Sequence, residues 1–337
     1  MLEVDDLHTH FTTPDGVVKA VDGVSFNLEP GETLGIVGES GSGKSVTALS
    51  IMQLNPEPPV SYPEGKILFE GENLLEASDK RMQQIRGNEI AMIFQDPMTS
   101  LNPVFTVGNQ IREAIRIHQG VSKSEAQEKT IQVLRDVGIA NPERRVGEYP
   151  HQFSGGMRQR AMIAMGLACN PRVLIADEPT TALDVTIQAQ ILELMVGLQE
   201  KYGTAIIMIT HDLGVVAQLA DKVMVMYAGR AVEPGTTDEV FYDPLMPYSW
   251  SLLRSLPRLD TAGEVRLLPV KGAPPSLIFL PKGCNFSPRC PFVKDECHEI
   301  DPDLYEKKPN HTAACILSVE EIEANKHRVD EELGVEG

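Results

Sequence analysis

The chain has 337 residues, a formal net charge of −18, and a composition that is 42% hydrophobic and 23% charged. This composition is that of an ordinary globular protein, and the length allows two domains or one large domain with an appendage. The acidic balance argues against nucleic acid as a partner, because a protein that tracks phosphates needs a basic face. No apolar run approaches the ~18 residues of a membrane-spanning helix, and the acidic N-terminus does not resemble a signal peptide, so the sequence predicts a cytosolic protein.

The first part of the chain reads as strands, a glycine-rich loop and a helix. Residues 17–26 alternate in the manner of a half-buried strand. Phe11 is expected in a loop before this strand, where its ring either stacks on an adenine or packs against other side chains. An apolar strand over 34–37 leads into the loop GESGSGKS, and a helix follows over 45–52.

A strand, a glycine loop and a helix in this order are the context of a phosphate-binding P-loop. The glycines allow backbone torsions and close approaches that a Cβ would forbid, and the N–H groups that open the helix face the phosphates. In such a loop the lysine reaches the β- and γ-phosphates, and the final hydroxyl binds Mg²⁺. The expected nucleotide-binding residues are Gly38, Glu39, Ser40, Gly41, Ser42, Gly43, Lys44 and Ser45.

Strands and helices alternate along the rest of the first 255 residues, which predicts a largely parallel sheet with its sites at the carboxyl ends of the strands. A mostly helical block over about 97–168 interrupts this alternation and suggests an inserted subdomain. The expected strands cover 66–75 (with a turn), 90–94, 173–176, 205–209, 222–227 and 230–232. The expected helices cover 78–86, 106–118, 122–137, 155–168 and 185–202.

Polar residues directly follow three of the apolar strands: Gln95, the pair Asp177–Glu178, and His211. We expect them to converge on the nucleotide, since these strand ends meet at the same edge of the sheet. Asp177 would hold Mg²⁺, and Glu178 would orient or deprotonate the attacking water. Gln95 would contact the metal or this water, and His211 the γ-phosphate.

A second helix start, at Ser154, Gly155 and Gly156, also has the residues of an anion-binding site. This second anion site can hardly bind the nucleotide that the P-loop of the same chain holds. It is explained if two subunits meet head to tail and each closes the nucleotide site of the other. The alternative is a routine serine-capped helix start.

The motifs GESGSGKS, FSGGM, VLIADEP, ALD (182–184) and ITHD (209–212) occur in this order. Over residues 1–255 the chain therefore resembles the nucleotide-binding subunits of ATP-binding-cassette (ABC) transporters. The resemblance implies an α/β P-loop ABC ATPase fold: a mixed sheet core, an antiparallel β part and an inserted helical subdomain. It identifies Phe11 with the adenine-stacking aromatic, Gln95 with the Q-loop, Glu178 with the general base, Asp184 with the D-loop and His211 with the switch histidine. Ser154, Gly155 and Gly156 match the signature that contacts ATP of the partner subunit, although Met157 replaces the more common glutamine.

A closer resemblance is carried by FSGGMRQRAMIAMGLACNP, QDPMTSLNP, MPYSWSLLRSLP and GAPPSL. These stretches are similar to the dipeptide/oligopeptide (and nickel) importer ATPases, in particular the first of their two paired ATPase subunits. The resemblance implies ATP and Mg²⁺ as ligands, and a paralogous or identical ATPase partner. It also implies two transmembrane permease subunits, an extracytoplasmic substrate-binding protein acting indirectly, and a location at the cytoplasmic face of the membrane.

Four of the five cysteines, Cys284, Cys290, Cys297 and Cys315, lie in the segment 256–337, which we expect to be a small irregular domain. Disulfides fit a reducing cytosol poorly. The spacing leaves structural zinc and an iron–sulfur cluster nearly equal, because zinc sites usually contain a closer cysteine pair. The resemblance to the peptide-importer ATPases favours a 4Fe–4S cluster. His298 and His311 are alternative ligands or exposed polar residues, and the acidic tail is expected to be a solvated helix or frayed.

Overall fold

The computed structural model describes the chain except residues 96–99, 182, 256–269 and 334–337. Six strands of the described chain form one sheet in the order β11-β10-β3-β9-β8-β7. The strands from β7 to β10 are parallel to one another, and β11 pairs with β10 in the antiparallel sense. Their bounds are β3 (Thr33–Val37), β7 (Ile90–Ile93), β8 (Val173–Asp177), β9 (Ala205–Ile209), β10 (Lys222–Tyr227) and β11 (Arg230–Thr236). The predicted parallel sheet is confirmed.

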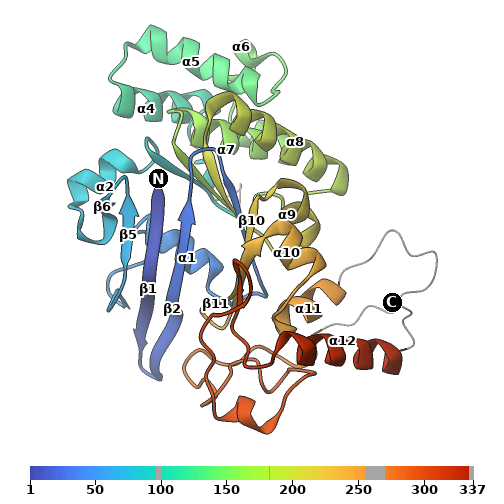
Figure 1. Ribbon diagram of the computed structural model, residues 1–337. Coiled ribbons are helices and arrows are strands. Elements are labelled where there is room, and N and C mark those ends of the chain that lie inside the picture. The colour runs from blue at the N-terminus through green and yellow to red at the C-terminus, as the bar shows by residue number, and fades with distance from the viewer. Residues whose placement is uncertain (96–99, 182, 256–269, 334–337) are drawn as a thin grey trace.

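A second, antiparallel sheet has the order β2-β1-β5-β6, with β4 also paired to β1 (Figure 1). Its strands are β1 (Leu2–Thr13), β2 (Gly16–Leu28), β4 (Val60–Ser61), β5 (Lys66–Phe69) and β6 (Glu72–Asn73). The prediction that Phe11 lies in a loop is wrong, because Phe11 pairs with Val18 and Val60 inside β1. Three register shifts between β1 and β2 interrupt the regular alternation, which explains why the sequence did not predict β1.

The helical block forms one end of the molecule, as α4 and α5 above the sheet in Figure 1 show. It is built on its own apolar cluster, which includes Ile111, Leu134 and Ile163 and reaches the sheet through Ile93 and Leu174. The block consists of α4 (Val107–Gln119), α5 (Lys123–Asp136), α6 (Pro142–Arg145), the 3₁₀ turn η2 (Pro150–Gln152) and α7 (Gly155–Leu167). The described part of 97–168 is mostly helical, as expected, and its assignment as an inserted subdomain stays a prediction.

The remaining helices border the sheets. Of these, α1, α2 and α8 were predicted, whereas α9, α10 and α11 were not. They are α1 (Lys44–Ile51), α2 (Asp79–Ile85), α8 (Val185–Tyr202), α9 (Leu213–Leu219), α10 (Thr237–Tyr242) and α11 (Pro247–Arg254), with the 3₁₀ turn η1 (Leu74–Glu76). Within the described residues, no helix is both long enough and apolar enough to cross a membrane.

The C-terminal segment contains η3 (Asp295–His298), a small hairpin of β12 (Tyr305–Lys308) and β13 (His311–Ala313), and α12 (Val319–Leu333). It shares a core with the main sheet, in which Phe286 and Phe292 pack in the same cluster as Val37 and Tyr227. The amide of Ala314 also donates to the Val232 carbonyl of β11 at 2.8 Å. The predicted division at 255/256 borders undescribed residues and stays a prediction.

His311 is fully buried, and its Nε2 lies 2.8 Å from Oε1 of the equally buried Glu233 of β11. The expectation that His311 is exposed is therefore wrong, whereas His298 is exposed as expected. The sequence could not reveal this burial, because the partner lies 78 positions earlier in the chain. The acidic tail forms α12 up to Leu333.

Candidate active site

The loop Gly38–Ser45 lies between β3 and α1, as the sequence predicts. At two positions of the loop only glycine fits, because neighbouring backbone atoms leave no room for a Cβ. A Cβ on Gly38 would lie 2.2 Å from the Met226 carbonyl oxygen, and one on Gly43 would lie 2.4 Å from that of Ala20. Both also have positive φ, 148° and 104°. The loop is thus held tightly against β10 and β2 in a conformation that side chains would disrupt.

Lys44 is buried under the loop that it serves. Its Nζ donates hydrogen bonds to the carbonyl oxygens of Gly38 at 2.8 Å and Glu39 at 2.9 Å. Burial lowers the pKa of the Lys44 ammonium, and the carboxylates of Glu178, Asp177 and Glu39 act in the opposite direction. The Lys44 ammonium therefore lies near several carboxylates, and a bound phosphate would be a further anionic partner for it.

Ser45 and Asp177 are brought together from α1 and the end of β8. The Ser45 hydroxyl donates to Asp177 Oδ1 at 3.1 Å. Burial raises the pKa of the Asp177 carboxyl, an effect that a nearby cation would reverse. A hydroxyl and a carboxylate at this separation are suited to share one Mg²⁺, since this ion prefers oxygen ligands.

Glu178 is the centre of the second half of the site. Its Oε2 accepts from Gln95 Nε2 at 2.8 Å and from the Thr181 hydroxyl at 2.9 Å. Its Oε1 lies 3.2 Å from Nδ1 of His211. Gln95 and His211 follow β7 and β9, the neighbours of β8, so these strand ends do meet, and their convergence on a nucleotide stays a prediction. The sequence did not indicate Thr181.

The carboxylate of Glu178 is held in its ionised form. Burial opposes ionisation, but hydrogen bonds from Thr181 and His211 and the charges of His211 and Lys44 lower the pKa of Glu178. Its backbone has φ +48°, an unusual value for a side chain of this size. Strained torsions of this kind occur where a functional group must point in one direction.

The residues expected to meet a partner subunit lie apart from this network. Ser154 caps α7 by accepting a hydrogen bond from the Met157 amide at 3.3 Å, and Ser154 and Gly155 are exposed. Asp184 caps α8 in the same way through the Ile187 amide, at 3.0 Å, and is also exposed. Ala182 of the ALD motif lies outside the described residues. Phe11 is partly buried on β1.

The four C-terminal cysteines surround one small apolar cavity of about 20 Å³, which Phe286, Pro302 and Leu317 also line. Within the described chain, no three cysteine sulfurs form a set in which all lie within 4.8 Å of one another. Burial raises the pKa of the Cys284 and Cys290 thiols, and that of Cys315 to about 11. The amide of Phe292 donates to the Cys290 sulfur at 3.4 Å.

Comparison with known proteins assigns both parts of the chain. Residues 21–181 match the ABC transporter family, and residues 232–297 match the oligopeptide/dipeptide transporter C-terminal region. An oligopeptide transport ATP-binding protein of Bacillus subtilis is 56% identical over 92% of this chain and 87% of its own length. A dipeptide transport ATP-binding protein of the same organism is 53% identical, covering 96% of each chain.

Solved structures agree with these sequence matches. A dimeric ATP-binding cassette in a post-hydrolysis state with ADP and Pi has a TM-score of 0.63 and 26% identity, covering 70% of this chain and 99% of its own. The sequence relatives extend this likeness through the C-terminal region. The chain thus belongs to the ABC transporter family, as an ATPase subunit of the branch that carries the oligopeptide/dipeptide transporter C-terminal region.

Proposed function

We propose that this ATPase drives import of di- or oligopeptides, or of a related small solute such as a nickel chelate, through separate membrane subunits. The observation that carries the catalytic part is the contact network in which Ser45 meets Asp177 while Gln95, Thr181 and His211 meet Glu178. The match to the oligopeptide/dipeptide transporter C-terminal region and the peptide-transport relatives support the assignment of peptides as the transported solute.

In this proposal Ser45, Asp177 and Gln95 hold Mg²⁺, which when bound neutralises phosphate charge. Lys44 and the loop amides bind the β- and γ-phosphates, and Phe11 contacts the adenine. Glu178 orients the attacking water and accepts its proton, while His211 contacts the γ-phosphate. The exposed Ser154, Gly155 and Asp184 and the partly buried Gly156 contact the nucleotide and loops of the second cassette.

The substitution Glu178→Gln tests the catalytic assignment, because it keeps the size and hydrogen-bonding ability of the side chain and removes the base. We expect ATP binding to persist, turnover to be lost and a closed cassette dimer to accumulate. Glu193→Gln, an exposed position on α8, is the matched control. Wild-type turnover in Glu178→Gln would eliminate Glu178 as the base.

The assembly we propose contains a paralogous ATPase subunit, with a homodimer as the alternative, and two transmembrane permease subunits. An extracytoplasmic binding protein supplies the solute, and the ATPase lies at the cytoplasmic face of the membrane. ATP hydrolysis by the assembly reconstituted in vesicles should rise with peptide-loaded binding protein. Stimulation by a nickel chelate and not by peptide would reassign the cargo.

We also propose a 4Fe–4S cluster on Cys284, Cys290, Cys297 and Cys315, with zinc as the alternative. Zinc with Zn–S bonds of about 2.3 Å requires sulfurs about 3.8 Å apart in a tetrahedron. Within the described residues, no three of the sulfurs all lie within 4.8 Å of one another, so they do not form such a tetrahedron as they stand. The choice of a cubane, in which each thiolate binds a different iron, rests on the resemblance to the peptide-importer ATPases. The amide bonded to the Cys290 sulfur would tune the potential of such a cluster.

Metal and sulfide analysis of anaerobically purified protein tests this second proposal. A brown protein with about four irons and matching sulfide per chain is expected. One zinc per chain, with no visible absorption, would replace the cluster by a structural zinc site and leave the ATPase assignment unchanged.

A further inference from the structure

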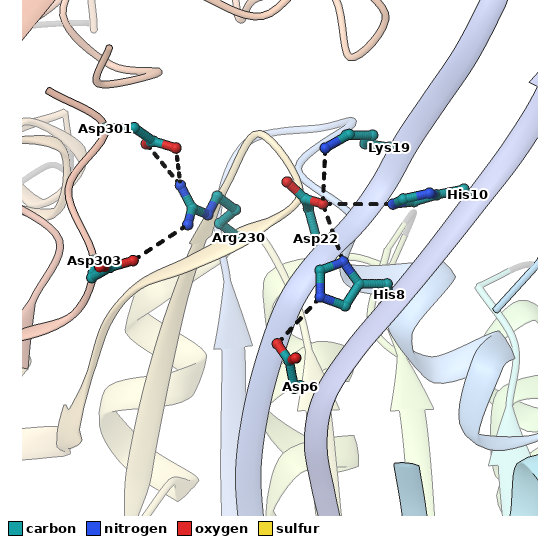
Figure 2. Close-up of polar contacts among 8 residues, drawn as sticks. All are labelled: Asp6, His8, His10, Lys19, Asp22, Arg230, Asp301 and Asp303. Carbon is teal, nitrogen blue, oxygen red and sulfur yellow. Dashed lines mark hydrogen bonds and ion pairs between the residues drawn. The ribbon is translucent and has the colours of Figure 1, made fainter. Parts of the chain in front are cut away.

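A group of metal-ligating side chains lies on the antiparallel sheet, and it includes no residue of the nucleotide loop and no cysteine. Figure 2 shows His8, His10 and Lys19 pointing toward Asp22. The His8 Nδ1–Asp22 Oδ1 and His10 Nε2–Asp22 Oδ1 distances are 3.2 and 3.5 Å. Ligand atoms of these three residues all lie within 4.8 Å of one another. We propose that His8, His10 and Asp22 form a binding site for a divalent transition-metal ion of the zinc type.

The strand register explains why these side chains meet. His8 pairs directly with Asp22, and His10 is two residues further along β1, so the three side chains lie on the same face. Register shifts on both sides of this pair leave Gly23 and Ala20 of β2 without direct partners in β1. Such bulges re-aim side chains, and here they bring the second imidazole to the same carboxylate.

The separations agree with one shared cation. Zinc at about 2.0–2.1 Å from nitrogen or oxygen ligands in a tetrahedron requires ligand atoms about 3.3 Å apart. The two measured separations bracket this value. The side chains of His8, His10 and Asp22 are only 18%, 16% and 17% exposed, so most of the competing water is already excluded.

Two further observations support the two imidazoles as metal ligands. His10 Nε2 is shielded from solvent and makes no hydrogen bond to the described residues, which is costly for a polar atom unless something binds it. His8 Nε2 lies 3.2 Å from Asp6 Oδ1. With its proton on Nε2, the ring keeps this bond and directs the Nδ1 lone pair toward Asp22, the arrangement in which a carboxylate orients a metal-binding histidine.

The surroundings allow a cation to enter. A cavity of about 250 Å³ is lined by Asp6, His8 and Asp22 on one side and by the C-terminal segment, including Cys284, on the other. Arg230, on the opposite wall, is held by Asp301 at 2.7 and 2.8 Å and faces away from Asp22 (Figure 2). Lys19 Nζ, 3.4 Å from Asp22, is the competing cation, but its side chain is 48% exposed and free to turn outward.

The donor set also gives selectivity. Two imidazoles and one carboxylate suit zinc, nickel or copper, whereas Mg²⁺ and Ca²⁺ prefer oxygen ligands alone. Excess Mg²⁺ for ATP should therefore not fill this site. A second group, Asp6, His8 and Glu64, offers one imidazole and two exposed carboxylates, so it would bind zinc more weakly.

Calorimetric titration of the full chain with Zn²⁺ in excess Mg²⁺ tests the proposal. Wild type should bind one more zinc ion than His10→Ala or Asp22→Asn, because we expect zinc affinity at this site to be at least about 100-fold weaker in both variants. In Asp6→Asn the zinc affinity should fall by about 10- to 100-fold. Lys19→Ala should bind zinc more tightly. His327→Ala, which removes an exposed histidine on α12, is the matched control and should behave as wild type.

Cobalt distinguishes this site from the cysteines, because cobalt bound to thiolates gives an intense charge-transfer band and cobalt bound to imidazole and carboxylate does not. The cobalt ion whose binding depends on His10 should give only weak visible absorption, without the thiolate charge-transfer band. Zinc should raise the melting temperature of wild type and His327→Ala by more than that of His10→Gln, whose metal-free melting temperature should match wild type. Equal zinc affinity in wild type and His10→Ala, or a His10-dependent spectrum with the thiolate band, would overturn the proposal.

Discussion

The guanidinium of Arg289 holds the carboxylate of Glu39 in the nucleotide loop by two hydrogen bonds, of 2.6 and 2.9 Å. The Arg289 side chain is 4% exposed, and its guanidinium lies over the ring of Tyr227 in a cation–π contact. The Glu39 amide donates to the Tyr248 hydroxyl at 2.9 Å, so both the side chain and the backbone of this loop residue are fixed. Since Cys290 is the next residue, the cysteine region is connected directly to the phosphate-binding loop.

We predict that Arg289→Lys weakens ATP binding while leaving the fold intact, because lysine keeps the charge but cannot make the paired hydrogen bonds. Losing one charged hydrogen bond should raise the Kd for ATP by about 10-fold. Fluorescent nucleotide titration measures this effect. Arg81→Lys, at the ion pairs with Glu72 and Glu89, provides a control remote from the loop; an equal loss there would mean that the Arg289 effect is not specific.

Lys44→Ala should weaken ATP binding itself. The buried ammonium now bonds two loop carbonyls and would bond phosphate oxygens instead, so we expect a loss of about 10- to 100-fold in affinity. Equilibrium binding of ATP measures the change, with Lys222→Ala as the control at a surface ion pair. Unchanged affinity in Lys44→Ala would refute its role in phosphate binding.

The buried Glu233–His311 pair should attach the C-terminal segment to β11. Glu233 also accepts hydrogen bonds from the amides of Leu245 and Met246, at 2.6 and 3.1 Å. We therefore expect Glu233→Ala to destabilise the protein by more than about 3 kcal/mol, and His311→Ala by less, because fewer buried groups lose their partners. Chemical denaturation gives both values. The reverse order would show that Glu233 is not the centre of this contact.

Asp136 should make stability depend on pH in the acidic range. Its carboxylate accepts from Lys201 at 2.7 Å and from the Tyr202 hydroxyl at 2.5 Å. Burial acts in the opposite direction, but these partners and Gln132 lower the pKa of Asp136 in the folded state. The stabilisation is therefore complete above the unfolded pKa of about 4 and disappears as pH falls through the folded pKa.

Asp136→Asn should accordingly lower the free energy of unfolding by about 1–2 kcal/mol at pH 7. Below pH ~4 the difference from wild type should shrink, because the wild-type carboxyl becomes protonated as well. Urea denaturation at several pH values measures both quantities. A difference that stayed constant down to acidic pH would exclude this ionisation as its source.

The sequence predicted the parts of the protein that depend on local pattern. The loop around Lys44 was recognisable because its glycines, lysine and hydroxyl are consecutive. Glu178 and His211 were recognisable because each follows an apolar strand, and adjacent parallel strands end together. The strand that contains Phe11 was missed because bulges break its alternation.

Contacts between distant segments could not be predicted in this way. Arg289 and Glu39 are 250 positions apart, and no local pattern marks either as the partner of the other. His311 was expected to be an alternative metal ligand or an exposed polar residue, whereas its partner in the fold is Glu233 of β11. The grouping of His8, His10 and Asp22 likewise depends on strand register, which the sequence alone did not fix.

The apolar cluster shared by the sheet and the C-terminal segment limits how the protein can be divided. Tyr227, Tyr248 and Phe286 pack with ring centroids 4.6–5.3 Å apart, and Val37 at the base of the nucleotide loop belongs to the same cluster. A chain cut after residue 255 would expose the two tyrosines and would lose Arg289, which binds the Glu39 carboxylate. Exchange of cassettes between related transporters would therefore have to carry the C-terminal segment along with the cassette.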